Sequence, residues 1–336
     1  MKLGTSLRFL FPTSAKTYEQ FRQTLAAMPP GGFIERPMGA YETDVQAANL
    51  LEVAATARAA GLDGLLFGDN HALSPAYANA FSPIPTVARL MAVTGTMPVG
   101  MVLLAPFYQP ILLAEQIGTL AAFAEAPLIV TLALGGRQRQ FEAFGIEERS
   151  RVGRLEELAV LLRALLAGES VQHEGRYYQL QGVQTGPTAR VPVSIWIGGT
   201  VPASAARAGR LGDGWLTGQN ASRAELIEQL EVYREAAARA GRTPYPVLRR
   251  DIYVGESDAE AHAVVDRILA EGYRGTGTDQ LLVGGAESIV QQLQEYRALG
   301  FEYVMVRHIV GDHQLMLRSF ERIGADIMPK IHDMLP

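Results

Sequence analysis

Apolar segments of strand length alternate with amphipathic stretches along most of the chain. A strand buried on both faces forms a short continuous apolar run, whereas a surface helix repeats its apolar positions every three to four residues. The continuous runs predict strands at residues 2–7, 63–68, 98–104, 127–134, 192–197, 213–216, 247–254 and 302–308. The amphipathic stretches predict helices at residues 45–60, 109–125, 151–167, 222–240, 286–299 and 314–333. Gly61, Gly241 and Gly300 follow three of these stretches, as glycines that end helices do.

This alternation predicts a parallel sheet with helices on its faces. Left open, the sheet would be doubly wound; closed, it would be a (β/α)8 TIM barrel with insertion loops at the C-terminal face. The strand count and the length of 336 residues favour the barrel, as a single domain over residues 1–336. Residues 11–44, 135–150 and 271–285 interrupt the alternation, and we expect them near the mouth of the barrel. Residues 170–191 predict a small hairpin turning at Glu174-Gly175.

Charge and composition narrow the class of partner. A net charge of -5 gives no reason to expect nucleic acid or an anionic membrane surface. The absence of cysteine excludes disulfides, thiolate catalysis and Cys-ligated zinc, and the six histidines show no metal-ligand spacing, so we predict no metal site. The N-terminal residues read as a strand rather than a signal peptide, and no apolar run reaches about 18 residues. We therefore expect a cytoplasmic protein without a membrane span.

Polar residues follow the second predicted strand in the stretch "LLFGDNHALSP". His71 would lie at the barrel mouth, where an imidazole can hold or move a proton near neutral pH. Asp69 and Asn70 could serve the site or simply form a turn with their own backbone. His71 is our candidate catalytic residue.

Two pairs of glycines follow later strands. Gly135 and Gly136 precede Arg137, and Gly198 and Gly199 precede Thr200 and an Ala-rich helix. Such glycines allow a ligand to approach the backbone, and a helix start attracts anions, so both loops are candidate phosphate contacts. The alternative is that each pair only forms the turn between strand and helix.

Familiar nucleotide and nucleophile motifs are missing. The chain contains no Walker sequence, no G-x-G-x-x-G and no G-x-S-x-G. A mononucleotide such as FMN remains a candidate ligand, and as a cofactor it would carry the difficult chemical step. Phe9, Phe67, Phe107, Tyr108 and Trp196 suggest an apolar substrate pocket.

The chain resembles the bacterial luciferase-like flavin oxidoreductases over nearly its whole length. The resemblance rests on the order of "GDNH", "MPVGMVLLAPFYQPILLAEQ", "LALGGRQRQFEAFGIEERSRVGRLEE", "GRYYQL", "PVSIWIGGTVPASAARAGRLGDGWL" and "VGGAESIVQQLQEYRALGFEYVMVR". It implies a (β/α)8 barrel that uses reduced FMN with oxygen, or the deazaflavin F420 as a hydride carrier.

The resemblance also implies positions for cofactor contacts. The family's phosphate pocket maps to the Gly136 N–H, Arg151 and the Gly199–Thr200 loop, and its strained non-prolyl cis peptide maps near Met101–Val102. Ala126-Pro127 and Leu134 depart from the family pattern, and we expect Arg137 to replace the arginine missing at position 134. The full set of expected cofactor-binding residues is Asn70, Met101, Val102, Gly135, Gly136, Arg137, Arg151, Gly198, Gly199 and Thr200.

Three functional hypotheses follow. The first is a monooxygenase that uses reduced FMN from a separate flavin reductase and O2 on a small organic substrate, with His71 as proton donor. The second is an F420-dependent hydride-transfer oxidoreductase. The third is a non-catalytic flavin-binding protein, suggested by the departures at Ala126-Pro127 and Leu134. Family resemblance also implies a homodimer.

Overall fold

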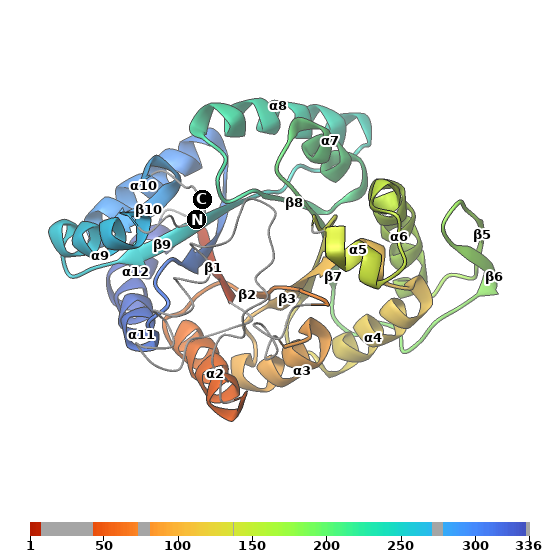
Figure 1. The fold of residues 1–336 in the computed structure, drawn as a ribbon, viewed down its shortest axis with the longest axis horizontal. Coiled ribbons are helices and arrows are strands. Elements are labelled where there is room, and N and C mark those ends of the chain that lie inside the picture. The colour runs from red at the N-terminus through yellow and green to blue at the C-terminus, as the bar shows by residue number, and fades with distance from the viewer. Residues whose placement is uncertain (8–42, 73–80, 137, 271–277, 334–336) are drawn as a thin grey trace.

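The computed structural model describes residues 1–7, 43–72, 81–136, 138–270 and 278–333. A nine-stranded parallel sheet lies at the centre of the molecule and closes on itself (Figure 1). Its strands are β1 (Lys2–Leu7), β2 (Leu65–Phe67), β3 (Val99–Leu104), β4 (Leu128–Ala133), β7 (Val193–Gly199), β8 (Gly214–Thr217), β9 (Pro246–Val254), β10 (Leu281–Gly284) and β11 (Tyr303–His308). The antiparallel hairpin of β5 (Val171–Glu174) and β6 (Gln179–Val183) forms a separate sheet.

Eight of these strands form the closed ring of a (β/α)8 TIM barrel. The ring runs β9-β11-β1-β2-β3-β4-β7-β8, and β8 pairs again with β9 where Trp215 meets Pro246 and Leu216 meets Val247. The ninth strand, β10, pairs with the C-terminal half of β9 and lies outside the ring. All strands of the ring are parallel, so their C-terminal ends meet at one mouth.

Helices surround the ring and supply the crossovers that parallel strands require (Figure 1). They are α2 (Thr43–Ala59), α3 (Pro83–Thr94), α4 (Pro110–Phe123), α5 (Gln138–Ala143), α6 (Arg151–Leu166), α7 (Pro202–Leu211), α8 (Arg223–Arg239), α9 (Asp258–Ala270), α10 (Ala286–Leu299), α11 (His313–Arg322) and α12 (Met328–His332). Their ends follow local chemistry. Ser222 and Glu225 form a capping box at the start of α8, and Gly300 ends α10 with a φ of 102°.

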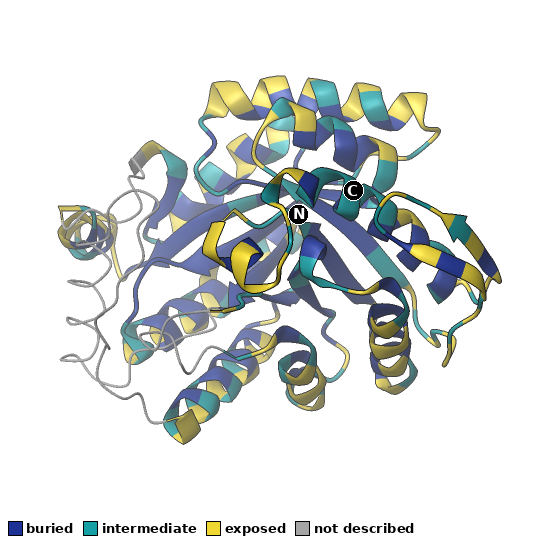
Figure 2. Cartoon of the chain, turned by 45° about the vertical axis from the view of Figure 1, so that its right-hand side comes forward, coloured by how far each residue is buried: buried dark blue, intermediate teal, exposed yellow. Residues whose placement is uncertain are grey.

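The core has two parts. The larger part lies between the strands and the inward faces of the helices, which are buried while their outer faces are exposed (Figure 2). The smaller part fills the inside of the barrel and consists of Leu66, Ile129, Trp196, Leu216, Val247, Tyr303 and Met305. Because side chains alternate along a strand, the residue two positions beyond the last of these on each strand also points into the barrel, nearer to the mouth.

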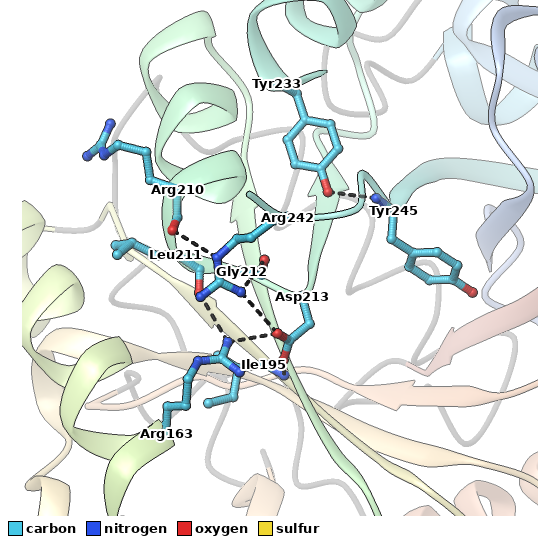
Figure 3. A network of polar contacts seen from close by, with 9 residues as sticks. All are labelled: Arg163, Ile195, Arg210, Leu211, Gly212, Asp213, Tyr233, Arg242 and Tyr245. Atoms are coloured by element: carbon cyan, nitrogen blue, oxygen red, sulfur yellow. Dashed lines mark hydrogen bonds and ion pairs between the residues drawn. The ribbon is translucent and has the colours of Figure 1, made fainter. Parts of the chain in front are cut away.

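The N-terminal end of the barrel is tied by an ionic network (Figure 3). Asp213, just before β8, accepts the main-chain N–H of Ile195 at 2.8 Å. Arg163 and Arg242 approach its other carboxylate oxygen at 2.8 and 3.3 Å (Figure 3). Both guanidinium groups also donate to main-chain carbonyls at the end of α7, those of Leu211 and Gly212 among them. This network ties α6 and the end of α7 to the start of β8, at the end of the barrel opposite the mouth.

The sequence predicted the elements of the ring well. All eight predicted strands are present, with bounds that differ by no more than two residues, and the hairpin is confirmed. Helices α3, α5 and α9 and strand β10 were missed. Helix α3 begins at Pro83, in a Pro-rich stretch that reads as a loop although a first helical turn accepts proline. Most of the predicted loop 11–44 lies outside the described residues, and no described helix is long and apolar enough to cross a membrane.

Candidate functional site

Asp69 organises the end of β2 at the barrel mouth. Its Oδ2 accepts the main-chain N–H of Leu104 at 2.9 Å and the hydroxyl of Tyr108 at 2.9 Å. The Nε2 of His71 lies 3.0 Å from the same oxygen. The Asp69 side chain is 0% exposed, and these donors stabilise its buried carboxylate. The sequence left Asp69 open between a role in the site and a turn, and gave no sign of its contacts with Leu104, Tyr108 and His71.

Tyr108 is fixed as a hydrogen-bond donor. Burial, together with the negative charge of Asp69 and the hydrogen bond to it, raises the pKa of the Tyr108 phenol well above its ordinary value. The phenol therefore stays protonated in any ordinary buffer and keeps donating to the carboxylate.

Aromatic rings surround the imidazole of His71. The rings of Phe107, Tyr108 and Phe144 lie edge-on to it, with centroids 5.7, 5.7 and 5.4 Å away. The His71 side chain keeps 22% of its surface exposed. The predicted catalytic residue thus has an apolar surround, a buried carboxylate at one nitrogen and remaining access from the mouth.

The backbone of the same loop is also held in place. Gln140 of α5, itself buried, donates its amide to Asn70 Oδ1 at 2.6 Å and to the carbonyl oxygen of His71 at 2.7 Å. Ala72 follows with a φ of 46°, a conformation that residues other than glycine seldom adopt. Asn70 is therefore at the mouth as predicted, with one of its amide atoms engaged by the protein.

The glycines after β4 and those at the end of β7 differ in their surroundings. Gly135 has a φ of 69°, and a Cβ on Gly136 would meet none of the described residues within 4 Å, so these residues leave the Gly136 backbone open to a ligand. Gly198 lies on the inner face of β7, and a Cβ there would be 3.6 Å from the Thr131 methyl group. A Cβ on Gly199 would be 2.2 Å from Ser204 Oγ, so the packing of α7 already requires glycine at position 199.

Other predicted contacts are distributed over the structure. Thr200 is exposed, and the N-cap of α7 is Val201 rather than Thr200. Arg151 begins α6 and forms an ion pair with Glu148. Arg137 lies outside the described residues.

The expectation at the end of β3 needs a correction. Val102 packs against the inner cluster, but Met101 is fully buried in the outer core, so its side chain does not face the mouth. The expected non-prolyl cis peptide near Met101–Val102 is absent: among the described residues the cis bond is Gly186-Pro187. Strand β3 instead keeps an unbroken register with β4 from Val99 to Leu104, which a regular trans backbone satisfies.

A buried ion pair lies on the inner faces of two further strands. Arg307 of β11 and Asp251 of β9 approach to 2.5 Å, and both are nearly inaccessible. His308, the next residue, faces the helices: its Nε2 lies 2.8 Å from Ser319 Oγ and its ring packs on Phe320. The His308 side chain therefore does not face the barrel mouth.

The substrate-pocket residues expected from the sequence are separated. Phe107 and Tyr108 lie beside His71, whereas Phe67 is in the outer core and Trp196 is inside the barrel. Phe9 is outside the described residues. An aromatic wall at the mouth thus remains, built by Phe107, Tyr108 and, unpredicted, Phe144.

The mouth has features that fit a planar polar cofactor. Two polar atoms, Thr131 Oγ1 and Asn220 Oδ1, are buried without a hydrogen-bond partner in the part of the chain that the structure describes. Thr131 lies on β4 and Asn220 follows β8, toward the C-terminal ends of ring strands. At the same end, a Cβ on Gly68 or Gly136 would meet no described residue within 4 Å. Buried polar groups are normally paired, so these atoms indicate room for a ligand with hydrogen-bonding edges. The described residues contain no cluster able to hold a metal ion.

The chain belongs to the luciferase-like monooxygenase family, whose model matches residues 32–303. This confirms the resemblance seen in the sequence. It is 30% identical over 205 residues to the F420-dependent glucose-6-phosphate dehydrogenase of Beutenbergia cavernae, over 58% of this chain and 60% of the relative. It is 31% identical over 163 residues to the F420-dependent hydroxymycolic acid dehydrogenase of Mycobacterium tuberculosis, covering 46% of this chain and 44% of the relative. The chain thus matches less than two thirds of each of these relatives.

Solved structures share the fold over nearly the whole chain. The monooxygenase RslO1 from Streptomyces bottropensis superposes with a TM-score of 0.78 at 21% identity, covering 98% of this chain and 99% of that one. The oxygenating constituent of 3,6-diketocamphane monooxygenase from Pseudomonas putida, in complex with FMN, superposes with a TM-score of 0.74 at 18% identity, covering 98% of this chain and 99% of that one. These likenesses establish the barrel fold.

Proposed function

We propose that the protein is an F420-dependent oxidoreductase that transfers a hydride between the deazaflavin and a carbon atom bearing a hydroxyl group in a small organic substrate. The observation that carries the proposal is His71, placed at the barrel mouth with the buried carboxylate of Asp69 at 3.0 Å. Oxidation of an alcohol to a carbonyl compound releases a proton together with the hydride, and a positioned imidazole accepts that proton near neutral pH.

The relatives change the preference that the sequence alone favoured. FMN with oxygen was the first hypothesis, but the dehydrogenases that are 30% and 31% identical to this chain are named as F420-dependent. The FMN-bound structure is similar only in fold, at 18% identity. F420 therefore has the stronger support, and FMN becomes the alternative that the experiment tests.

Several residues would hold the cofactor. The unpartnered Thr131 and Asn220 oxygens would accept hydrogen bonds from its ring edge, and the accessible backbone of Gly136 would contact its anionic tail. When bound, F420 would supply a two-electron hydride acceptor. The protein contributes orientation, a proton acceptor in His71, and the aromatic wall of Phe107 and Phe144, which limits access of water.

Binding separates the two cofactors directly. The purified protein is titrated in parallel with F420 and with reduced FMN, and cofactor fluorescence or absorbance is followed. We expect saturable F420 binding and much weaker FMN binding. Tight binding of reduced FMN without F420 binding would overturn the proposal in favour of a monooxygenase.

Replacement of His71 tests its role. His71→Ala should lower turnover by about 10²–10⁴-fold, the usual contribution of a general acid or base, while F420 affinity changes by less than about threefold. Equal losses of turnover and affinity would make His71 a binding residue instead.

A further inference from the structure

The hydrogen bonds around Asp69 constrain where His71 carries its proton. The main-chain N–H of Leu104 can only donate, and the Tyr108 hydroxyl remains protonated, so Asp69 Oδ2 acts as an acceptor for both. An unprotonated Nε2 facing this oxygen at 3.0 Å would set two lone pairs against each other. A protonated Nε2 instead gives the carboxylate a third donor.

The opposite ring nitrogen is left available. No hydrogen bond joins His71 Nδ1 to any residue in the described segments, and the side chain is 22% exposed. A neutral imidazole carries one proton, so a proton on Nε2 leaves a lone pair on Nδ1. The lone pair then lies on the ring edge that is not held by Asp69.

We propose that Asp69 is a positioning residue that fixes His71 as the Nε2–H tautomer, so that Nδ1 is the atom that takes the substrate proton. The assignment rests on the proposed function for its catalytic meaning. In that reaction the O–H bond of the substrate breaks and its proton passes to Nδ1; a bound deazaflavin would accept the hydride from the carbon atom that bears the hydroxyl group. Reversal of the reaction returns the proton from Nδ1 to the carbonyl oxygen.

The chain contains a matched pair at the other end of the same strand. Asp63, just before β2, accepts the main-chain N–H of Leu3 at 2.8 Å and lies 3.1 Å from His332 Nε2. Asp69, just after β2, makes the same kind of contacts to Leu104 and His71. Asp63→Asn is therefore a control that removes an equivalent carboxylate away from the mouth.

The test uses the cofactor-free protein with labelled histidine ring nitrogens. Long-range proton–nitrogen NMR at alkaline pH distinguishes the two neutral tautomers, and His71→Gln identifies the His71 signals. We expect wild-type His71 as the Nε2–H form. Asp69→Asn should give a mixture of tautomers, because an amide can either donate to or accept from the ring. Asp63→Asn should leave the His71 signals unchanged and alter those of His332.

The possible outcomes test the positioning role of Asp69 and the proposed function separately. A wild-type His71 protonated at Nδ1, or an unaltered tautomer in Asp69→Asn, would overturn the positioning role. The wild-type spectrum decides alone if Asp69→Asn does not fold. F420 titration of Asp69→Asn should give an affinity within about threefold of wild type, since the residue acts through His71. Failure of the wild-type protein to bind F420 would reject the proposed function and leave the tautomer result standing.

Discussion

The hydroxyl of Tyr178 donates to the main-chain carbonyl of Tyr108 across 3.1 Å. Tyr178 precedes strand β6 of the insertion hairpin, and the hydroxyl of Tyr108 in turn donates to Asp69. The hairpin thus braces the loop after β3 that supports the candidate catalytic histidine. Its distance from His71 along the chain gives no hint of this connection.

Removal of that brace should affect both stability and turnover. Tyr178→Phe loses one buried hydrogen bond, which should lower the free energy of unfolding by about 0.5–1.5 kcal/mol. We also expect a several-fold fall in turnover, because Tyr108 is held less firmly. Urea unfolding and steady-state assays measure the two effects. Tyr177→Phe is the control, since Tyr177 makes its contact through its ring, 5.2 Å from the Arg154 guanidinium. An equal loss in both variants would contradict a specific role for the Tyr178 hydroxyl.

The two glycines at the end of β7 should respond differently to alanine. Gly199→Ala places a Cβ against Ser204 and should lower stability by about 1–3 kcal/mol, as overpacking does. Gly198→Ala meets only ordinary contacts of 3.6 Å or more, so its melting temperature should stay close to that of wild type. Thermal unfolding measures both.

A double variant checks the cause of that difference. Ser204→Gly removes the side chain that a Cβ on Gly199 would strike, so it should restore part of the stability lost in Gly199→Ala. F420 titration of Gly198→Ala then reports whether the inner face of β7 contacts the cofactor. Full stability of Gly199→Ala would contradict the packing explanation for Gly199.

Glu157 should make stability depend on acid pH. Burial by itself would raise the pKa of Glu157, but hydrogen bonds from the N–H groups of Tyr177, Tyr178 and Arg176 and from His173 bring it below its ordinary value of 4.5. A carboxyl with a lowered folded-state pKa stabilises the fold above its unfolded pKa and loses that contribution as the pH falls through the folded value. The difference in unfolding free energy between wild type and Glu157→Gln should therefore shrink below about pH 4.5.

Urea unfolding between neutral and acid pH measures that difference. Glu169→Gln is the control, because Glu169 is an exposed carboxylate just beyond α6. The free energy of unfolding of Glu169→Gln should change with pH in parallel with that of wild type. A difference for Glu157→Gln that stays constant with pH would contradict the role of its charge.

The network at the N-terminal end should contribute to stability without affecting the mouth. Asp213→Asn keeps an acceptor for the Ile195 N–H but removes the charge shared by Arg163 and Arg242. The Asp213 side chain is 30% exposed, so we expect a loss of only about 1–2 kcal/mol. F420 affinity should remain that of wild type, since the network lies at the opposite end of the barrel. A large fall in affinity would show that the two ends are coupled.

The sequence by itself determined the alternation of strands and helices and hence the barrel. Apolar periodicity is a local property, and every ring strand was visible as a short run such as residues 98–104 or 302–308. Local signals also placed His71, Gly136 and Gly198 after strands, and parallel strands bring such positions to one mouth. Strand β10 was not predicted, because its four residues beside a Gly-rich stretch are too few to show a hydrophobic pattern.

Only the tertiary structure decided which side chains meet. Asp69 contacts Tyr108, 39 residues further along the chain, and Tyr108 contacts Tyr178, 70 residues further on. Strand order and an insertion bring these residues together, and no local pattern specifies either. The side to which His308 points and the contact between Gly199 and Ser204 depend in the same way on register and helix packing. Hydrophobic periodicity determines which face of an element is apolar, whereas the closure of the barrel determines which residues pack against that face.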